Sequence, residues 1–303
     1  MDTKKRIANI PKIISAVQFG SSVSGDTYEG SDIDLLLVVK DEKTEVEKKV
    51  RKKLNSEYQI HVYTKEEFLD SARKGDPLSL SIIHTGKVLV NKVFINALKK
   101  YQPNRHTAKK CMLNSFAALG LGFSDLIHGL TWDAVNSIYH AARSSIWAIL
   151  MEQEVTPKNQ RVLELLKDNE IRNKYQEIIE FRNHIPDYDM GLNGAEKLWE
   201  QEVNEFTDFL AKSCRIIKKN YLQVFQKNFI DPFDLLAIMR KHYEKPQFYS
   251  IMLSVNWDKM IPFYHILMMD EKEQVSLIVD AHTGKIKKSM VGIEQLQKTC
   301  LSC

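Results

Sequence analysis

The sequence predicts a multi-domain α+β protein with three regions. Residues 1–102 alternate between strand and helix patterns, which predicts an N-terminal α/β domain with a small mixed sheet. Residues 103–226 carry long helical patterns, which predict a central helical bundle joined by short loops. Strand patterns return in residues 227–303 after one further helix, which predicts a small C-terminal α+β domain.

Composition places the chain among ordinary globular proteins. Its 303 residues are enough for two or three domains, and 44% are hydrophobic and 27% charged. The formal net charge of +4 is compatible with a nucleotide or nucleic-acid partner without requiring one. No apolar run is long enough to cross a bilayer, and the N-terminus has no apolar signal core, so we expect a cytoplasmic protein without a membrane partner.

The four cysteines do not predict a metal site. Cys111 and Cys214 fall in helical patterns and are expected to be buried thiols. Cys300 and Cys303 form a lone pair at the end of the chain, whereas a structural zinc site would need a second pair of ligands.

In the first region, isoleucines at positions 7, 10, 13 and 14 predict a short helix, and residues 17–19 predict a strand that enters a Gly-Ser turn. Residues 42–54 predict an amphipathic helix with solvated charged faces, and residues 58–63 alternate as a strand does. Thr64 and Glu67 have the spacing of a capping box. A helix over 78–83 and a strand over 87–91 complete this region.

Helices are expected to begin near Leu113 and to cover 134–151, 161–166, 175–182 and 198–219, with Ala141 and Ala142 allowing close helix approach. Pro232 opens a further helix that ends near His242. Strands are then expected over 248–255, 262–269 and 274–279, the last closed by a tight turn that begins at Asp280.

The most informative segment is Gly20-Ser21-Ser22, followed by Ser31-Asp32-Ile33-Asp34 at the head of an apolar run. Residues two apart in a strand point to the same face, so Asp32 and Asp34 present two carboxylates side by side. A divalent cation removes their repulsion, and Mg²⁺ favours one or two carboxylates together with phosphate oxygens of a substrate. The small-residue turn offers backbone N–H groups and a hydroxyl to those phosphates. Together these features indicate nucleotide phosphoryl chemistry.

This pattern resembles the signature of the DNA polymerase β-like nucleotidyltransferases, and above all of the minimal nucleotidyltransferases. The resemblance implies that Asp32 and Asp34 hold Mg²⁺ or Mn²⁺ and carry catalysis, with a nucleoside triphosphate as substrate. It also implies phosphate binding by the turn and its flanks, with these candidates: Gly20, Ser21, Ser22 and Ser31.

The sequence departs from this family where a third carboxylate is expected on a neighbouring strand. Gln59 occupies that position, His61 is the next candidate, and Glu57 would require a shift of register. A glutamine can offer its carbonyl oxygen to a metal but carries no charge and is no base. We therefore expect a weakened second metal position.

The helical region resembles HEPN domains, on residues 133–143 and on Arg182 with Asp187-Tyr188-Asp189. It departs from the nuclease members, because Asp187 stands where they place a histidine after the arginine. We expect no RNase activity. Arg182, Asp187 and Tyr188 are the candidate functional residues here, and a homodimer through this region is a possible partner arrangement.

Two functions follow. The first is transfer of a nucleoside monophosphate from a nucleoside triphosphate to a hydroxyl of a protein, a small molecule or an RNA end. The alternative is a catalytically weakened nucleotide-binding protein with a regulatory, antitoxin-like or scaffold role, in which the helical region mediates contacts.

Overall fold

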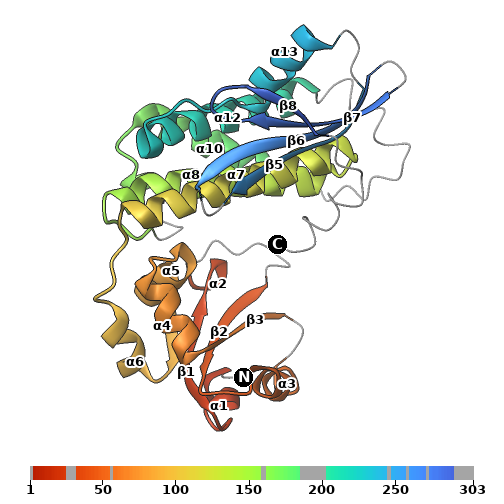
Figure 1. Cartoon of the computed structure of the whole chain (residues 1–303). Helices are drawn as coiled ribbons and strands as arrows, with labels where there is room; N and C mark the ends of the chain where they lie inside the picture. Colours follow the sequence, from red (N-terminus) through yellow and green to blue (C-terminus); the bar gives the residue numbers. More distant parts are fainter. Residues whose placement is uncertain are drawn as a thin grey trace. The chain divides into compact units, whose positions relative to one another are not determined.

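The computed structural model describes residues 3–24, 32–54, 57–157, 162–184, 203–243, 247–256, 259–270 and 273–289. The chain divides into two compact units. The first unit comprises residues 1–110 and 149–167, and the second comprises residues 111–148 and 168–303. Figure 1 shows the elements of both. The mixed α+β architecture confirms the predicted fold class. The exact domain boundaries that we drew from the sequence stay predictions.

The first unit is built on a four-stranded mixed sheet in the order β3-β2-β1-β4. Strand β1 (Ile13–Phe19) pairs antiparallel with β2 (Ile33–Val39) and with β4 (Lys87–Val90), whereas β2 pairs parallel with β3 (Tyr58–Thr64). The apolar run 35–39 in β2 is fully buried, as expected for a central strand that is covered on both faces.

Helices cover both faces of this sheet (Figure 1). One face packs against α4 (Lys65–Arg73), α5 (Pro77–Thr85) and α6 (Lys92–Leu98). The other face packs against α1 (Thr3–Ile7) and α3 (Lys43–Arg51). The start of β2 therefore lies at one end of a rigid, two-sided core.

The predicted capping box at the start of α4 is confirmed. The Thr64 hydroxyl accepts a hydrogen bond from the Glu67 amide at 3.2 Å, and the Glu67 carboxylate accepts one from the Thr64 amide at 2.8 Å. Since these two bonds satisfy N–H groups that the first helical turn leaves unpaired, the cap fixes where β3 ends and α4 begins.

Two predictions for this unit were wrong in detail. Ile13 and Ile14 belong to β1 and not to a helix, because α1 ends at Ile7 and Lys12 turns the chain with a φ of 73°. Helix α6 was not predicted, although its N-cap Asn91 accepts a hydrogen bond from the Phe94 amide in an ordinary capping contact.

Helices dominate the second unit, as predicted. Helices α7 (Arg105–Ile127) and α8 (Thr131–Glu152) pack closely, and the Ser115 hydroxyl donates to the Ala141 carbonyl at 2.7 Å. Ala141 and Ala142 are fully buried, which confirms the close approach expected from their size. The remaining helices described are α9 (Val162–Leu165), which falls in the first unit, and α10 (Asn169–His184), α12 (Val203–Phe225) and α13 (Pro232–His242).

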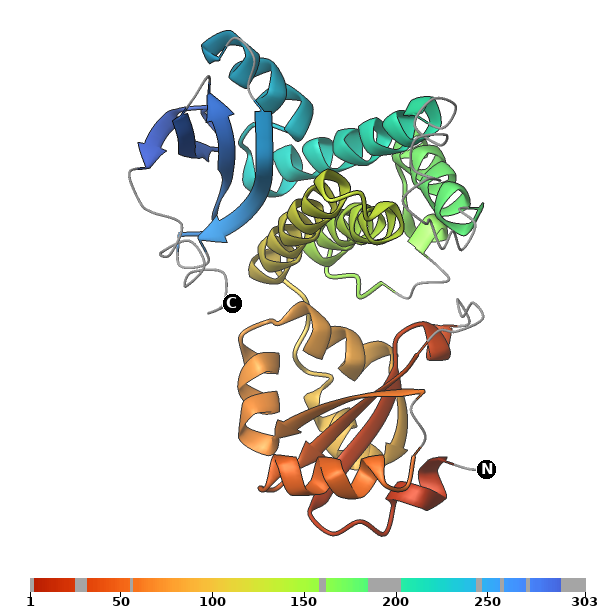
Figure 2. The same cartoon turned by 90° about the vertical axis from the view of Figure 1, so that its right-hand side faces the viewer.

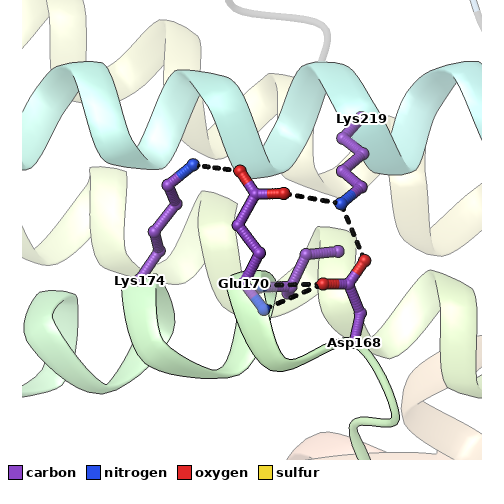
Figure 3. A network of polar contacts seen from close by, with 5 residues as sticks. Asp168, Glu170, Lys174 and Lys219 are labelled. Carbon is purple, nitrogen blue, oxygen red and sulfur yellow. Dashed lines mark hydrogen bonds and ion pairs between the residues drawn. The ribbon is translucent and has the colours of Figure 1, made fainter.

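Helices α10 and α12 are joined by a network of charges at the start of α10 (Figure 3). Asp168 accepts hydrogen bonds from the amides of Glu170 and Ile171 and so caps the helix. Lys219 of α12 reaches Asp168 at 2.7 Å and Glu170 at 3.0 Å, while Lys174 reaches the other oxygen of Glu170. The pKa values of Asp168 and Glu170 are lowered, chiefly by hydrogen bonds from Lys219 and Lys174 respectively.

The second sheet is antiparallel throughout, in the order β5-β6-β7-β8. Its strands are β5 (Gln247–Asn256), β6 (Ile261–Asp270), β7 (Glu273–Asp280) and β8 (Ile286–Ser289). The first three were predicted apart from their ends, and β8 was not predicted. The turn after β7 is confirmed: Asp280 accepts from the amides of His282 and Thr283, and Gly284 has a φ of +69°.

Figure 2 shows this sheet beside α13 and α12. The buried Tyr264 hydroxyl donates to the Ile230 carbonyl at 2.7 Å and ties β6 to the start of α13. Cys111 and Cys214 are buried thiols, as predicted. Within the described ranges, none of the helices combines the length and the apolar character that crossing a membrane requires.

Candidate functional site

The candidate site lies where β1 ends and β2 begins. Phe19, the last residue of β1, pairs with Asp34 in the antiparallel register. Gly20 follows with a φ of +73°, a conformation in which glycine is favoured, and the short helix α2 (Ser21–Ser24) comes directly after it. The turn thus brings small residues next to the first carboxylate of β2.

Contact between Gly20 and Asp34 is close. A Cβ atom at position 20 would overlap the Asp34 carboxylate and lie 3.1 Å from its Cγ. The Asp34 side chain is 24% exposed, so it is sheltered by the turn and still open to solvent. Because position 20 is a glycine, its backbone lies directly against the Asp34 carboxylate. Any other residue would place a side chain between them.

Asp32 and Asp34 lie at the start of β2. Asp32 is exposed and stands immediately before β2. Asp34 continues the stripe of Leu36 and Val38, which are buried against α4 and α5. The stripe therefore changes from apolar to acidic at the start of the strand.

The structure describes the side chains of only some of the phosphate-binding candidates. The Ser22 hydroxyl donates to the Phe19 carbonyl at 3.1 Å and accepts from the Gln18 side-chain amide at 3.2 Å. Its proton is thus used to hold the turn. The side chain of Ser21 and the whole of Ser31 lie outside the described residues.

The neighbouring strand places Gln59 and His61 beside Asp34. Gln59 is the register partner of Asp34 in the parallel pair, and His61 is the partner of Leu36. Partners in register share a face of the sheet, which agrees with the face predicted from alternation. His61 Nε2 lies 3.7 Å from Asp34 Oδ1, and the His61 ring rests near the Phe19 ring at 5.4 Å between centroids.

The aromatic support from Phe19 was not foreseen. In the sequence Phe19 looks like an ordinary strand residue, and its contact with His61 depends on the order of β1, β2 and β3. Among the described residues, no cluster of three or more histidine, cysteine or acidic side chains has the geometry of a metal site. The neighbouring strand thus adds an amide and an imidazole to the two aspartates.

Arg182 of α10 lies on α8 in the second unit. Its Nε donates to the Asn136 side-chain oxygen at 2.8 Å, and its guanidinium stacks on the Tyr139 ring at 4.4 Å. Burial and the charges of Arg143 and Arg182 lower the pKa of His140 to about 3, so that this imidazole is neutral. Asp187 and Tyr188 lie outside the described residues, and the HEPN resemblance stays a prediction.

Residues 2–93 match the family Polymerase beta, Nucleotidyltransferase. The match spans β1, the Gly20 turn, β2 and β3, and it supports a nucleotidyltransferase fold for these residues. It ends before the helical region.

Among solved structures, this chain is similar to a nucleotidyltransferase-like protein from Exiguobacterium sibiricum 255-15. The similarity covers 81% of this chain and 79% of that one, with 14% sequence identity and a TM-score of 0.32. None of the curated proteins matches this chain.

Proposed function

We propose that the N-terminal nucleotidyltransferase domain transfers a nucleoside monophosphate from a nucleoside triphosphate to an acceptor hydroxyl, with Mg²⁺ or Mn²⁺ as cofactor. The observation that carries the proposal is the juxtaposition of the Asp34 carboxylate with the backbone of Gly20, with Asp32 two residues before Asp34. This arrangement offers anionic ligands to a cation and backbone amides to a phosphate at one place.

The residues present fit a divalent cation. Asp32 and Asp34 are hard oxygen ligands, and the Asp34 carboxylate occupies the place that a Cβ at position 20 would take while remaining 24% exposed. A bound cation would neutralise charge on the phosphates and orient the triphosphate for in-line attack. Asp32 and Asp34 would hold it, and the turn at Gly20 and Ser21 would bind the phosphates that leave.

The proposed reaction is a substitution at the α-phosphorus. The acceptor oxygen forms a bond to the α-phosphorus, the bond between that phosphorus and the oxygen bridging to the β-phosphate breaks, and pyrophosphate leaves. The hydroxyl proton passes to solvent water. Protein groups act mainly by positioning, since little covalent chemistry is left to them.

A second candidate function is nucleotide binding without turnover. It is supported by the neighbouring strand, which places the neutral Gln59 beside Asp34. Without a third negative charge, a second cation would be bound weakly and the acceptor hydroxyl would be poorly activated. In this case the helical region would carry the output, through a protein partner or a second copy of the chain.

Binding of Mg²⁺–ATP to the full chain tests the site. Asp32→Asn and Asp34→Asn should each weaken binding more than tenfold and change the free energy of unfolding by less than about 0.5 kcal/mol. Calorimetric titration measures the affinity, and denaturation followed by circular dichroism measures the stability. Asp70→Asn is the matched control, because Asp70 is an exposed carboxylate of the same unit that pairs with Lys74.

Equal binding by the wild type and both site variants would show that the site is assigned to the wrong residues. Incubation with α-labelled ATP and a panel of acceptors then separates the two functions. Label transferred by the wild type and not by Asp34→Asn supports the transferase, whereas tight binding without transfer supports the second candidate.

A further inference from the structure

His61 leans across the first sheet towards the Asp34 carboxylate. It projects from β3 on the face that also carries Asp34, and its ring centroid lies 5.4 Å from that of Phe19 on β1. Neighbouring strands lie about 4.8 Å apart, so β1 and β3 are separated by about twice that distance, with β2 between them. The two rings meet above β2, which places the imidazole over the strand that carries Asp34.

The spacing between the imidazole and the carboxylate suits a shared cation. His61 Nε2 lies 3.7 Å from Asp34 Oδ1, which is longer than a hydrogen bond of about 2.7–3.2 Å. Nitrogen and oxygen atoms that bind an ion such as Zn²⁺ lie about 2.0–2.2 Å from it, so two neighbouring ligand atoms are roughly 3–3.5 Å apart. A shift of a few tenths of an ångström would bring both atoms within reach of one ion.

The contacts of both side chains leave the facing atoms open. Asp34 Oδ2 is the atom that a Cβ at Gly20 would meet, so the turn lies against one carboxylate oxygen and His61 faces the other. The His61 and Asp34 side chains are 30% and 24% exposed. In the described ranges, neither ring nitrogen of His61 takes part in a hydrogen bond. Nε2 is therefore available to an ion.

An imidazole changes which ion this place favours. Carboxylate, carbonyl and water ligands suit Mg²⁺, whereas imidazole suits first-row transition metals. Gln59, the register partner of Asp34, could add only a hard carbonyl oxygen, so the nitrogen ligand comes from His61. Since the residues that the structure describes hold no cluster of three such side chains, water and phosphate oxygens are left to complete the coordination.

We infer that His61 and Asp34 together bind a divalent transition-metal ion, with Mn²⁺ bound in preference to Mg²⁺, and that His61 sets this preference. The pair of ligands, an imidazole nitrogen facing a carboxylate oxygen, rests on the distance and the orientation of the two side chains. The use of the bound ion to hold a triphosphate rests on the proposed function.

Electron paramagnetic resonance of Mn²⁺ bound to the full chain tests the ligand directly. In frozen solution, the electron spin echo of the bound ion should carry the modulation of a directly coordinated imidazole nitrogen. The modulation should disappear in His61→Gln and persist in His106→Gln, which changes an exposed histidine of the same unit. Absence of the modulation in the wild type would overturn the inference whether or not His61→Gln folds.

The signal of free Mn²⁺, followed during titration and in competition with Mg²⁺, tests the preference. The wild type should bind Mn²⁺ about tenfold or more tighter than Mg²⁺. His61→Gln should weaken Mn²⁺ binding by about tenfold or more and Mg²⁺ binding by less than about threefold. Nitrogen modulation that persists in folded His61→Gln, or equal losses for the two ions, would show that His61 only packs beside the carboxylate.

Nucleotide binding keeps the two proposals apart. Calorimetric titration with ATP in the presence of Mn²⁺, and again of Mg²⁺, shows whether the site takes a triphosphate. A nitrogen signal from His61 without ATP binding would refute the proposed function and leave the metal pair standing. ATP binding that depends on Asp34 but comes without a nitrogen signal would refute the role of His61 alone.

Discussion

Gly20 and Gly129 have nearly the same backbone conformation in different surroundings. Their φ angles are +73° and +75°, so both positions favour glycine for the same steric reason. At Gly20 an added Cβ would meet the Asp34 carboxylate, whereas an added Cβ at Gly129 would meet no atom of the described residues within 4 Å, its chain neighbours aside. The pair separates the effect of backbone strain from the effect of crowding the site.

We expect Gly20→Ala and Gly129→Ala each to cost about 1 kcal/mol or more of folding free energy from backbone strain. Only Gly20→Ala should also weaken Mg²⁺–ATP binding, by tenfold or more, because its methyl group displaces the carboxylate. Denaturation measures the first effect and calorimetric titration the second. Unchanged nucleotide binding in folded Gly20→Ala would contradict the role given to this turn.

Gln59 is the second residue whose change is informative. It is exposed and is the register partner of Asp34, so a carboxylate at this position would stand beside the two aspartates. We expect Gln59→Glu to raise the rate of label transfer at saturating Mg²⁺, because a third negative charge strengthens a second cation position. The double variant Gln59→Glu/Asp34→Asn should show no gain. A measurable wild-type rate that Gln59→Glu leaves unchanged would count against Gln59 as the missing ligand.

At the scale of elements, α7 meets β5 through a glycine. A Cβ at Gly120 would overlap the backbone of Leu253, with the Leu253 carbonyl oxygen, amide nitrogen and carbonyl carbon all close to it. The helix therefore lies directly against the strand backbone, and β5 is an end strand of the sheet order. A helix in this place shields the edge of a sheet from pairing with another chain.

This contact reverses the usual effect of replacing a helical glycine. On propensity alone Gly120→Ala would stabilise α7 by up to about 1 kcal/mol. We expect a net loss of about 1–3 kcal/mol of folding free energy instead, since the methyl group overpacks a backbone that cannot rotate away. Urea denaturation followed by tryptophan fluorescence measures it, and a stabilised Gly120→Ala would show that α7 and β5 are not packed in this way.

At the scale of the whole molecule, the tryptophans are unevenly distributed between the two units. All four tryptophans fall within the residue ranges of the second unit, so their fluorescence reports the unfolding of that unit. The same unit contains His140, His265 and His282, whose pKa values are lowered mainly by burial. These histidines resist protonation in the folded state and accept protons readily after unfolding.

The sign of the pH effect follows from this difference. In the unfolded chain these histidines have a pKa near 6.5, whereas in the folded chain their pKa is lower. Below pH 6.5 the unfolded chain therefore binds more protons than the folded chain, so stability falls as pH decreases from about 6.5 towards about 3. For His140 the slope is up to about 1.4 kcal/mol per pH unit in that window. The carboxylates with lowered pKa values, such as Asp168, contribute only at lower pH, near 4 and below.

Urea denaturation at a series of pH values, followed by tryptophan fluorescence, should show this slope between about pH 6.5 and 5. His140→Gln should flatten it, while His128→Gln, which changes an exposed histidine, should not. The readout is the slope and not the absolute stability, so a destabilised His140→Gln still decides the question. Identical slopes in the wild type and His140→Gln would contradict the buried, neutral imidazole.

The sequence by itself determined the fold class, most of the elements and the place of the acidic pair. Local rules act over a few residues: the alternation around Asp32 and Asp34, the capping pair Thr64 and Glu67, and the turn at Asp280 each carry their own signal. Where a local pattern was ambiguous, as at Ile13, pairing with Val39 across the sheet decided for a strand.

Only the tertiary structure decided what surrounds the carboxylates. The closeness of Gly20 to Asp34 and the contact of His61 with Asp34 and Phe19 both depend on strand order and helix packing. Such contacts join residues far apart in the chain, and no spacing in the sequence encodes them, because they arise from the burial of the apolar faces of the sheet.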